Sequence, residues 1–206
     1  MNSRYKTISY PKGDWDGSVF LLLTGNKDRV GDLIALYSQY AVNSVLIEYW
    51  PHNSYWFDEK PLFHLLPSKD SNNEYLISRI ESIASSFGEI LRNIKKHDQA
   101  KKIFLVGNGI GGCIALKIAM MNPLIDHTIC HNGCLFSIHQ ANSKFSANID
   151  YYYYKKDKCF SCEDRYLPTI EWLKNHNLSV TSYDEGKNEV RDMDVEKSCN
   201  KLLNFN

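Results

Sequence analysis

Short runs of apolar residues alternate along the chain with amphipathic stretches. Residues 18–23 (SVFLLL) are apolar at nearly every position, and the run ends in Thr24-Gly25. A continuous run of this length is typical of a strand buried on both faces. Further strands are predicted at residues 45–49, 103–106, 128–130, 150–154 and 178–183.

The amphipathic stretches predict helices between these strands. In residues 74–96, apolar side chains recur at helical spacing, and Asn72 or Asn73 is available as the N-cap. Other helices are predicted at residues 32–40, from the glycines at 107–112 to about residue 121, and at 165–175 and 194–205. Alternating strands and helices predict a mainly parallel sheet with helices on both faces. Functional residues of such sheets gather at the C-terminal edge of the strands.

Length, composition and charge narrow the class of protein. The 206 residues favour a single domain over residues 1–206, and 43% hydrophobic with 23% charged residues is an ordinary globular mix. Zero net charge disfavours nucleic acid and anionic membranes as partners. No apolar run approaches the roughly 20 residues of a membrane span, and the N-terminus has no apolar signal core. We therefore expect a cytoplasmic protein with its cysteines reduced, and no cofactor.

The glycine-rich turn at Gly107–Gly112 has two interpretations. It matches G-x-G-x-x-G between a strand and a helix, as in a dinucleotide site. That fingerprint also needs an acidic residue at the end of the next strand, which here ends in Cys130-His131-Asn132, and the turn does not open the fold. The alternative is a nucleophile elbow, G-x-S-x-G, in which Gly109 occupies the place of the nucleophile.

Several short motifs, in order along nearly the whole chain, resemble the phospholipase/carboxylesterase family of α/β-hydrolases, which includes the acyl-protein thioesterases. The resemblance implies an α/β-hydrolase fold without a separate lid domain. The matching segments are 21–26 (LLLTGN), 54–58 (SYWFD), 107–112 (GNGIGG), 132–135 (NGCL), 155–157 (KKD) and 183–190 (YDEGKNEV).

The resemblance also assigns roles to individual positions. The triad positions become Gly109, Asp157 and Asn188, and the last two are expected within hydrogen-bond reach. The oxyanion-hole donors would be the backbone N–H groups of Asn26 and Ile110. The remaining ligand-binding positions implied by the resemblance are Thr24, Gly25, Trp56 and Phe57.

Two of the three triad positions have lost their chemistry. Gly109 has no nucleophilic atom, and the Asn188 amide cannot take and return a proton near neutral pH. The sequence therefore predicts a non-catalytic homologue that binds a small acyl or ester-like ligand, or a protein partner such as a second copy of itself. An active carboxylesterase or thioesterase that uses other residues, and a dinucleotide-binding protein, are the alternatives.

Cysteines and aromatic residues near the predicted site leave further alternatives. Cys130, Cys134, Cys159 and Cys162 would form a zinc site if their loops converged, and the C-x-x-C of Cys159 and Cys162 is alternatively a redox pair. Simple packing of these thiols is the favoured interpretation, so no metal is predicted. Cys134 with His131 is a weaker candidate for a substitute catalytic pair. The aromatic residues in 49–57 would line a ligand groove or cover the sheet edge, and residues 151–154 (YYYY) are predicted to form a strand with buried rings.

Overall fold

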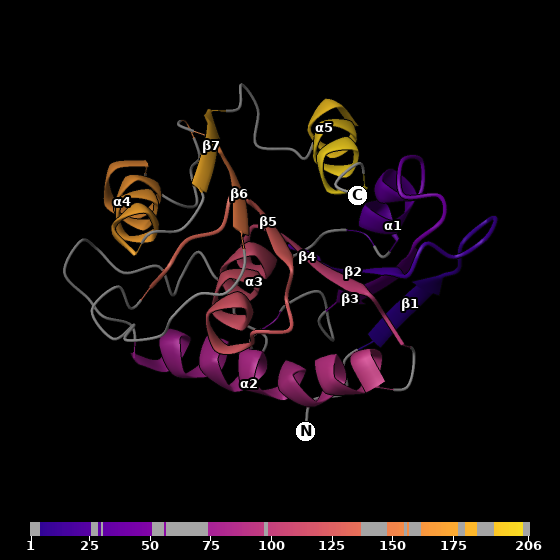
Figure 1. The fold of residues 1–206 in the computed structure, drawn as a ribbon. Coiled ribbons are helices and arrows are strands. Elements are labelled where there is room, and N and C mark those ends of the chain that lie inside the picture. Colours follow the sequence, from indigo (N-terminus) through magenta and orange to yellow (C-terminus); the bar gives the residue numbers. More distant parts are fainter. Residues whose placement is uncertain are drawn as a thin grey trace.

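A central sheet organises the chain, and helices pack on both of its faces (Figure 1). The computed structural model describes residues 5–25, 29, 31–50, 56, 74–96, 99–136, 148–154, 156, 162–176, 180–184 and 192–203. Within these residues, seven strands are joined in the order β1-β3-β2-β4-β5-β6-β7. Their bounds are β1 (Tyr5–Ser9), β2 (Ser18–Leu23), β3 (Val45–Trp50), β4 (Lys102–Asn108), β5 (His127–His131), β6 (Asn148–Tyr153) and β7 (Val180–Asp184).

Every strand except β1 is parallel to its neighbours, so the prediction of a mainly parallel sheet is confirmed. The sequence pattern missed β1, which pairs antiparallel with β3 at the edge of the sheet. Its sequence, YKTIS, has no apolar run, because an edge strand buries less of its surface than a central strand does.

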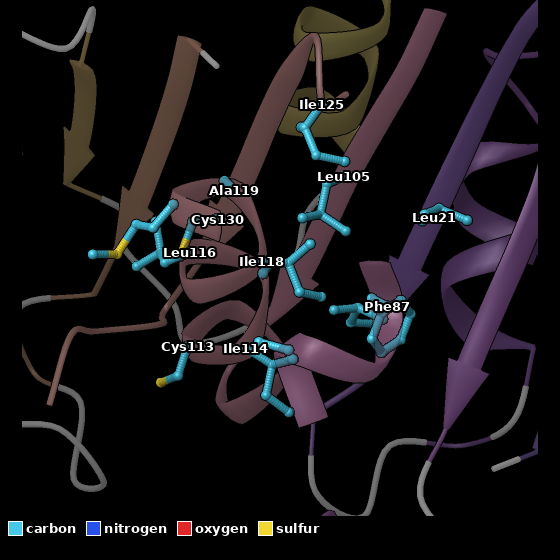
Figure 2. Packing of buried hydrophobic residues seen from close by; sticks show 14 of the residues in the cluster. Leu21, Phe87, Leu105, Cys113, Ile114, Leu116, Ile118, Ala119, Ile125 and Cys130 are labelled. Carbon is cyan, nitrogen blue, oxygen red and sulfur yellow. The ribbon is translucent and has the colours of Figure 1, made fainter. Parts of the chain in front are cut away.

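The helices form two layers, each with its own hydrophobic core. Helices α2, α3 and α4 cover one face of the sheet, and α1 and α5 cover the other (Figure 1). Buried residues of α2 and α3 meet the inner face of β2 and β4, as Phe87, Ile118 and Leu105 do (Figure 2). The helix bounds are α1 (Asp32–Tyr37), α2 (Glu74–Lys96), α3 (Ile110–Met121), α4 (Leu167–Asn175) and α5 (Asp192–Leu203).

Some predicted boundaries were wrong by a few residues. Helix α1 ends at Tyr37, three residues earlier than expected, and α5 begins at Asp192. The helix predicted from Arg165 begins instead as a π-helical turn, Cys162–Tyr166, before α4. Of the helices in the described part of the chain, none combines the length and the apolar character that crossing a bilayer requires.

The aromatic run of residues 151–154 lies mainly in β6, as predicted. Tyr151 and Tyr153 pack in the core covered by α2, α3 and α4, where both rings contact Tyr166, whereas Tyr152 points into the core under α5. Since side chains alternate along a strand, this run supplies buried rings to both faces of the sheet at once.

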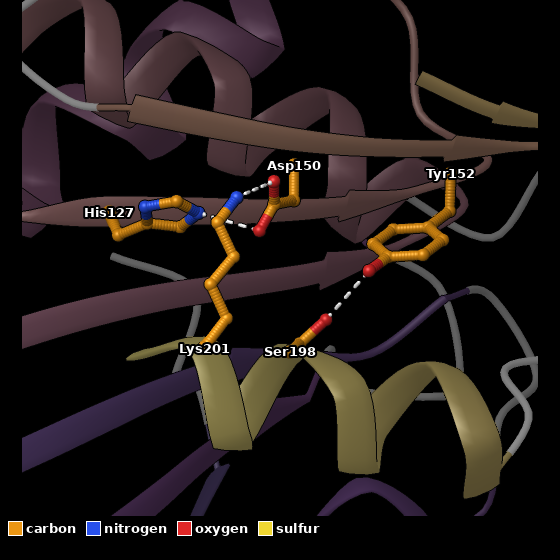
Figure 3. Close-up of polar contacts among 5 residues, drawn as sticks. All are labelled: His127, Asp150, Tyr152, Ser198 and Lys201. Atoms are coloured by element: carbon orange, nitrogen blue, oxygen red, sulfur yellow. Dashed lines mark hydrogen bonds and ion pairs between the residues drawn. The ribbon is translucent and has the colours of Figure 1, made fainter. Parts of the chain in front are cut away.

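A buried polar network attaches α5 to the sheet (Figure 3). The Asp150 carboxylate, 1% exposed, lies 3.0 Å from Nε2 of His127 and 2.6 Å from Nζ of Lys201. Beside it, the hydroxyl groups of Tyr152 and Ser198 lie 2.8 Å apart. Burial by itself raises the pKa of the Asp150 carboxyl group, but the hydrogen bonds and charges of His127 and Lys201 outweigh it and hold that pKa below its usual value.

The substitution Asp150→Asn is expected to lower the free energy of unfolding by about 3 kcal/mol, because it removes the charged partner of Lys201 within a buried network. Above about pH 4, the ordinary pKa of an aspartate in an unfolded chain, the ionised carboxylate stabilises the folded chain, and this contribution is lost as the pH falls through the lowered folded-state pKa.

Urea unfolding measured between pH 3 and 7 checks both effects. The variant should lose less stability than the native chain over the acid part of that range. Asp14→Asn changes an exposed carboxylate in the β1–β2 loop and serves as the matched control, with no effect expected. If both variants had the same free energy of unfolding at every pH, the network would contribute nothing to the stability of the fold.

Candidate functional site

The turn between β4 and α3 is a sharp elbow at Gly109. This residue has φ 53° and ψ −119°, a backbone conformation that glycine adopts and other residues avoid. Its N–H donates to the carbonyl oxygen of His131 at 2.8 Å, and its own carbonyl oxygen accepts from the N–H of Cys113 at 3.2 Å, which starts helix α3. The elbow is therefore fixed both to β5 and to the helix that follows.

The neighbouring glycines allow α3 to approach the sheet closely. A Cβ atom on Gly111 would lie less than 3.0 Å from backbone atoms of Leu23 and Thr24, and one on Gly107 would meet Gly111 and Gly112 equally closely. At Gly109 the described residues leave more room, since the nearest of their atoms to a Cβ there would be Cα of Gly25 at 3.9 Å. Close packing therefore requires glycine at positions 107 and 111, whereas at position 109 the backbone conformation favours it.

The elbow lies at the point where the strand order reverses. The chain passes from β2 to β3 on one side, and then returns to place β4 on the other side of β2 (Figure 1). In open α/β sheets, ligands bind outside the carboxyl ends of the strands at such a switch point. Thr24 and Gly25 follow β2 there, and Gly109 follows β4.

Three of the predicted ligand-binding residues gather at this point. The carbonyl oxygen of Thr24 accepts a hydrogen bond from Nε1 of Trp56 at 2.7 Å, and the Thr24 hydroxyl donates to the carbonyl of Tyr49 at 3.4 Å. Trp56 is 5% exposed, and Gly25 is the nearest neighbour of the open position at Gly109. Their part in ligand binding stays a prediction.

Glu48, which the sequence analysis did not single out, fixes the far end of the loop that follows β2. Its buried carboxylate on β3 accepts hydrogen bonds from the backbone N–H groups of Gly31 at 2.7 Å and Leu33 at 3.3 Å. An anionic group at a helix N-terminus satisfies donors that have no partner within the helix. The sequence signal was a single acidic residue inside an otherwise apolar strand (VLIEYW).

Of the remaining predicted site residues, Ile110 lies in the described part of the chain and most of the others lie outside it. Ile110, whose backbone N–H is a predicted oxyanion-hole donor, is the first residue of helix α3 and directly follows the elbow. Its role as a donor stays a prediction. Asn26, Phe57, Asp157, Asn188 and Cys159 lie outside the described residues, so the expected contact between Asp157 and Asn188 also stays a prediction.

The cysteines near the elbow are buried. Sγ of Cys113 lies 4.0 Å from Sγ of Cys134, and the backbone N–H of Cys134 donates to Sγ of Cys113 at 3.2 Å. Burial raises the pKa of the Cys130 and Cys134 thiols well above their usual value, and interaction with Cys113 adds to this effect. A thiol that is not ionised is a weak nucleophile.

The proposed pairing of Cys134 with His131 has no support in the geometry. Cys134 packs in the core under α2 and α3, whereas the ring of His131 stacks on Tyr152, at 4.7 Å between centroids, in the direction of α5. No group of three or more metal-ligating side chains occurs among the described residues, where Cys130 and Cys134 lie. Of the other two cysteines in the zinc hypothesis, Cys162 begins the π-helical turn.

A buried amide next to the elbow was not recognised as a site residue from the sequence. Asn132 follows β5 and has the left-handed φ of 51°. Its backbone N–H donates to the backbone carbonyl oxygen of Tyr152 at 2.8 Å. Its side chain is buried, and neither the amide nitrogen nor the amide oxygen has a hydrogen-bond partner in the described part of the chain. A buried amide in this state is costly unless water or a bound molecule supplies the bonds.

Comparison with solved structures identifies the fold. Esterase PE8 superposes with a TM-score of 0.78 at 14% sequence identity, covering 97% of this chain and 98% of the esterase. A phospholipase/carboxylesterase from Dyadobacter fermentans gives 0.75 at 15% identity, with 98% and 97% covered. This chain has the α/β-hydrolase fold.

A solved thioesterase structure is also similar to this chain. Acyl-protein thioesterase 2 from Zea mays gives a TM-score of 0.70 at 14% identity, with 97% of both chains covered. No family model matches the sequence, and no curated protein matches it. The superpositions cover nearly the whole length of this chain and of each neighbour, which agrees with the prediction of the fold without an added lid.

Proposed function

We propose that this α/β-hydrolase-fold protein is a non-catalytic relative of the carboxylesterases and thioesterases, and that it binds a small acyl or ester-like ligand at the elbow. The observation that carries the proposal is Gly109, which has the backbone conformation of a nucleophile elbow, one that other residues avoid, but no side chain. Hydrolysis through an acyl-enzyme needs a nucleophilic oxygen or sulfur atom at this place.

The three described cysteines near the elbow are poor replacements for the missing nucleophile. Cys113, Cys130 and Cys134 are buried, and burial raises the pKa of the last two thiols. The sequence offers Asn188 where the resemblance expects the histidine, so a general base is missing as well. These two losses reinforce each other, because the members of a triad act as a unit.

Features that favour ligand binding remain at the elbow. Helix α3 directs its first N–H groups toward the switch point, where they lack partners within the helix. Within the described part of the chain, the space beside Gly109 is not filled by another side chain, since the nearest atom to a Cβ there would be Cα of Gly25 at 3.9 Å. A carbonyl oxygen of an acyl group would be accommodated by such donors without being attacked.

The test of this proposal is labelling with a fluorophosphonate probe, followed by an assay with p-nitrophenyl butyrate. We expect no covalent labelling and no burst of p-nitrophenol, because both require an activated nucleophile. Protection of the chain against thermal unfolding by butyramide or a butyrate ester would indicate binding without turnover. Stoichiometric labelling of any serine or cysteine would overturn the proposal and support an active esterase that uses other residues.

A further inference from the structure

A concave site lies away from the elbow, at the edge of the sheet. It is a groove of about 530 Å³ between strands β1, β3 and β2 and the C-terminal half of α2. Its volume is in the range of small-molecule sites, roughly 300–1,000 Å³. None of the described residues that line it belongs to the elbow or to the group Thr24, Gly25 and Trp56.

The groove follows from the register of the edge strand. Lys6 and Ile8 of β1 lie opposite Tyr49 and Ile47 of β3, so all four side chains face the layer of α2. Ile8 of β1 and Ile90 of α2 are only partly buried where they pack against the core. Strand β1 therefore continues the apolar face of the sheet beyond the part that α2 fully covers.

The two ends of the groove differ in chemistry. Lys6 lies at one end and is the charged residue among the described lining. Tyr10 and Trp15 lie at the other end, 72% and 37% exposed, and Nε1 of Trp15 donates to the carbonyl oxygen of Ser18 at 3.0 Å, which fixes the indole ring. Lys6 and Tyr10 are four residues apart along an extended edge, a span of about 13 Å.

We propose that this groove binds a medium-chain fatty acid. The carboxylate pairs with the ammonium group of Lys6, and the hydrocarbon chain lies along Ile8 and Ile47 toward Trp15. An extended ten-carbon chain is comparable in length to the groove. Lys6 is the charged residue among the described lining, which is mostly apolar, so the groove selects an anionic head group over a neutral or cationic one. This site is independent of the function proposed for the elbow.

The first test is calorimetric titration of the native chain with decanoate, and with decyltrimethylammonium as a probe of the same tail and opposite charge. We expect decanoate to bind one molecule per chain, and the cation to bind more weakly. Lys6→Met should weaken the binding of decanoate about fivefold, the effect of a partly exposed ion pair. Lys12→Met, which removes an exposed lysine outside the groove, is the matched control and should bind as the native chain does.

A variant that fills the groove tests the proposal without changing any charge. Ile8→Trp places a large side chain inside the groove, and it should abolish binding of decanoate while thermal unfolding shows that the chain is folded. Gly109→Ser should leave binding of decanoate unchanged. Absence of binding to the native chain, or binding that is lost in Gly109→Ser but kept in Ile8→Trp, would overturn the proposal. So would a native dimer that Ile8→Trp dissociates, because the groove would then belong to a second copy of the chain.

Discussion

The double substitution Gly109→Ser/Asn188→His is expected to raise hydrolysis of p-nitrophenyl butyrate at least about 100-fold over the native chain. The serine would supply the missing nucleophile at the elbow, and the histidine would supply the general base. Asp157, which the resemblance assigns as the third member, is already present to orient the imidazole.

Local geometry at Gly109 favours this gain of activity. Among the described residues, no atom lies closer to a new Cβ than Cα of Gly25 at 3.9 Å, so these residues leave room for a hydroxymethyl group. The backbone is already in the strained conformation of an elbow, with φ 53°, and a serine there is expected to cost about 1–3 kcal/mol of stability. The new hydroxyl would stand beside the first N–H groups of α3, where an oxyanion would be stabilised.

Initial rates of p-nitrophenol release measure this prediction, with three controls. Each single variant should remain close to the native rate, since neither a serine without a base nor a histidine without a nucleophile completes the reaction. Gly109→Ala/Asn188→His differs from the active pair only by the hydroxyl oxygen. If this control were as fast as the serine variant, the elbow would not be the site of attack.

The substitution Gly111→Ala is expected to lower the free energy of unfolding by about 4 kcal/mol or more. Helix propensity alone predicts the opposite sign, because replacing glycine by alanine within a helix stabilises by roughly 1 kcal/mol. Packing decides the outcome. The new methyl group would overlap the backbone of Leu23 and Thr24, which belongs to a central part of the sheet and has no room to move.

Two other glycines provide matched comparisons by urea unfolding. Gly88→Ala in α2 should stabilise by about 0.5–1 kcal/mol, since its Cβ would make only ordinary contacts, 3.5 Å from Oδ1 of Asn122 and 3.6 Å from Nη1 of Arg92. Gly109→Ala should destabilise by about 1–3 kcal/mol through its backbone conformation without any steric overlap. An unperturbed Gly111→Ala variant would contradict the close approach of α3 to β2.

The apolar runs and helical periodicity of the sequence were sufficient to predict the central strands, the long helices and a mainly parallel sheet. Residues 18–23 and 74–96 were assigned with the observed bounds because a strand buried on both faces and an amphipathic helix carry strong local patterns. The edge strand β1 was missed because its pattern is polar. The start of α4 was misplaced because the π-helical turn before it has no recognisable sequence signal.

By itself, the sequence determined that no nucleophile stands at residue 109, because that depends only on which side chain is present. Only the tertiary structure decided that Gly107 and Gly111 are packed against backbone while no described residue crowds Gly109, since three glycines of one turn look alike in sequence. It also decided that Cys113 and Cys134 lie together, that Asp150 joins His127 and Lys201, and that Lys6 borders an apolar groove. These contacts join residues distant in the chain, and strand order and register, which no local pattern encodes, bring them together.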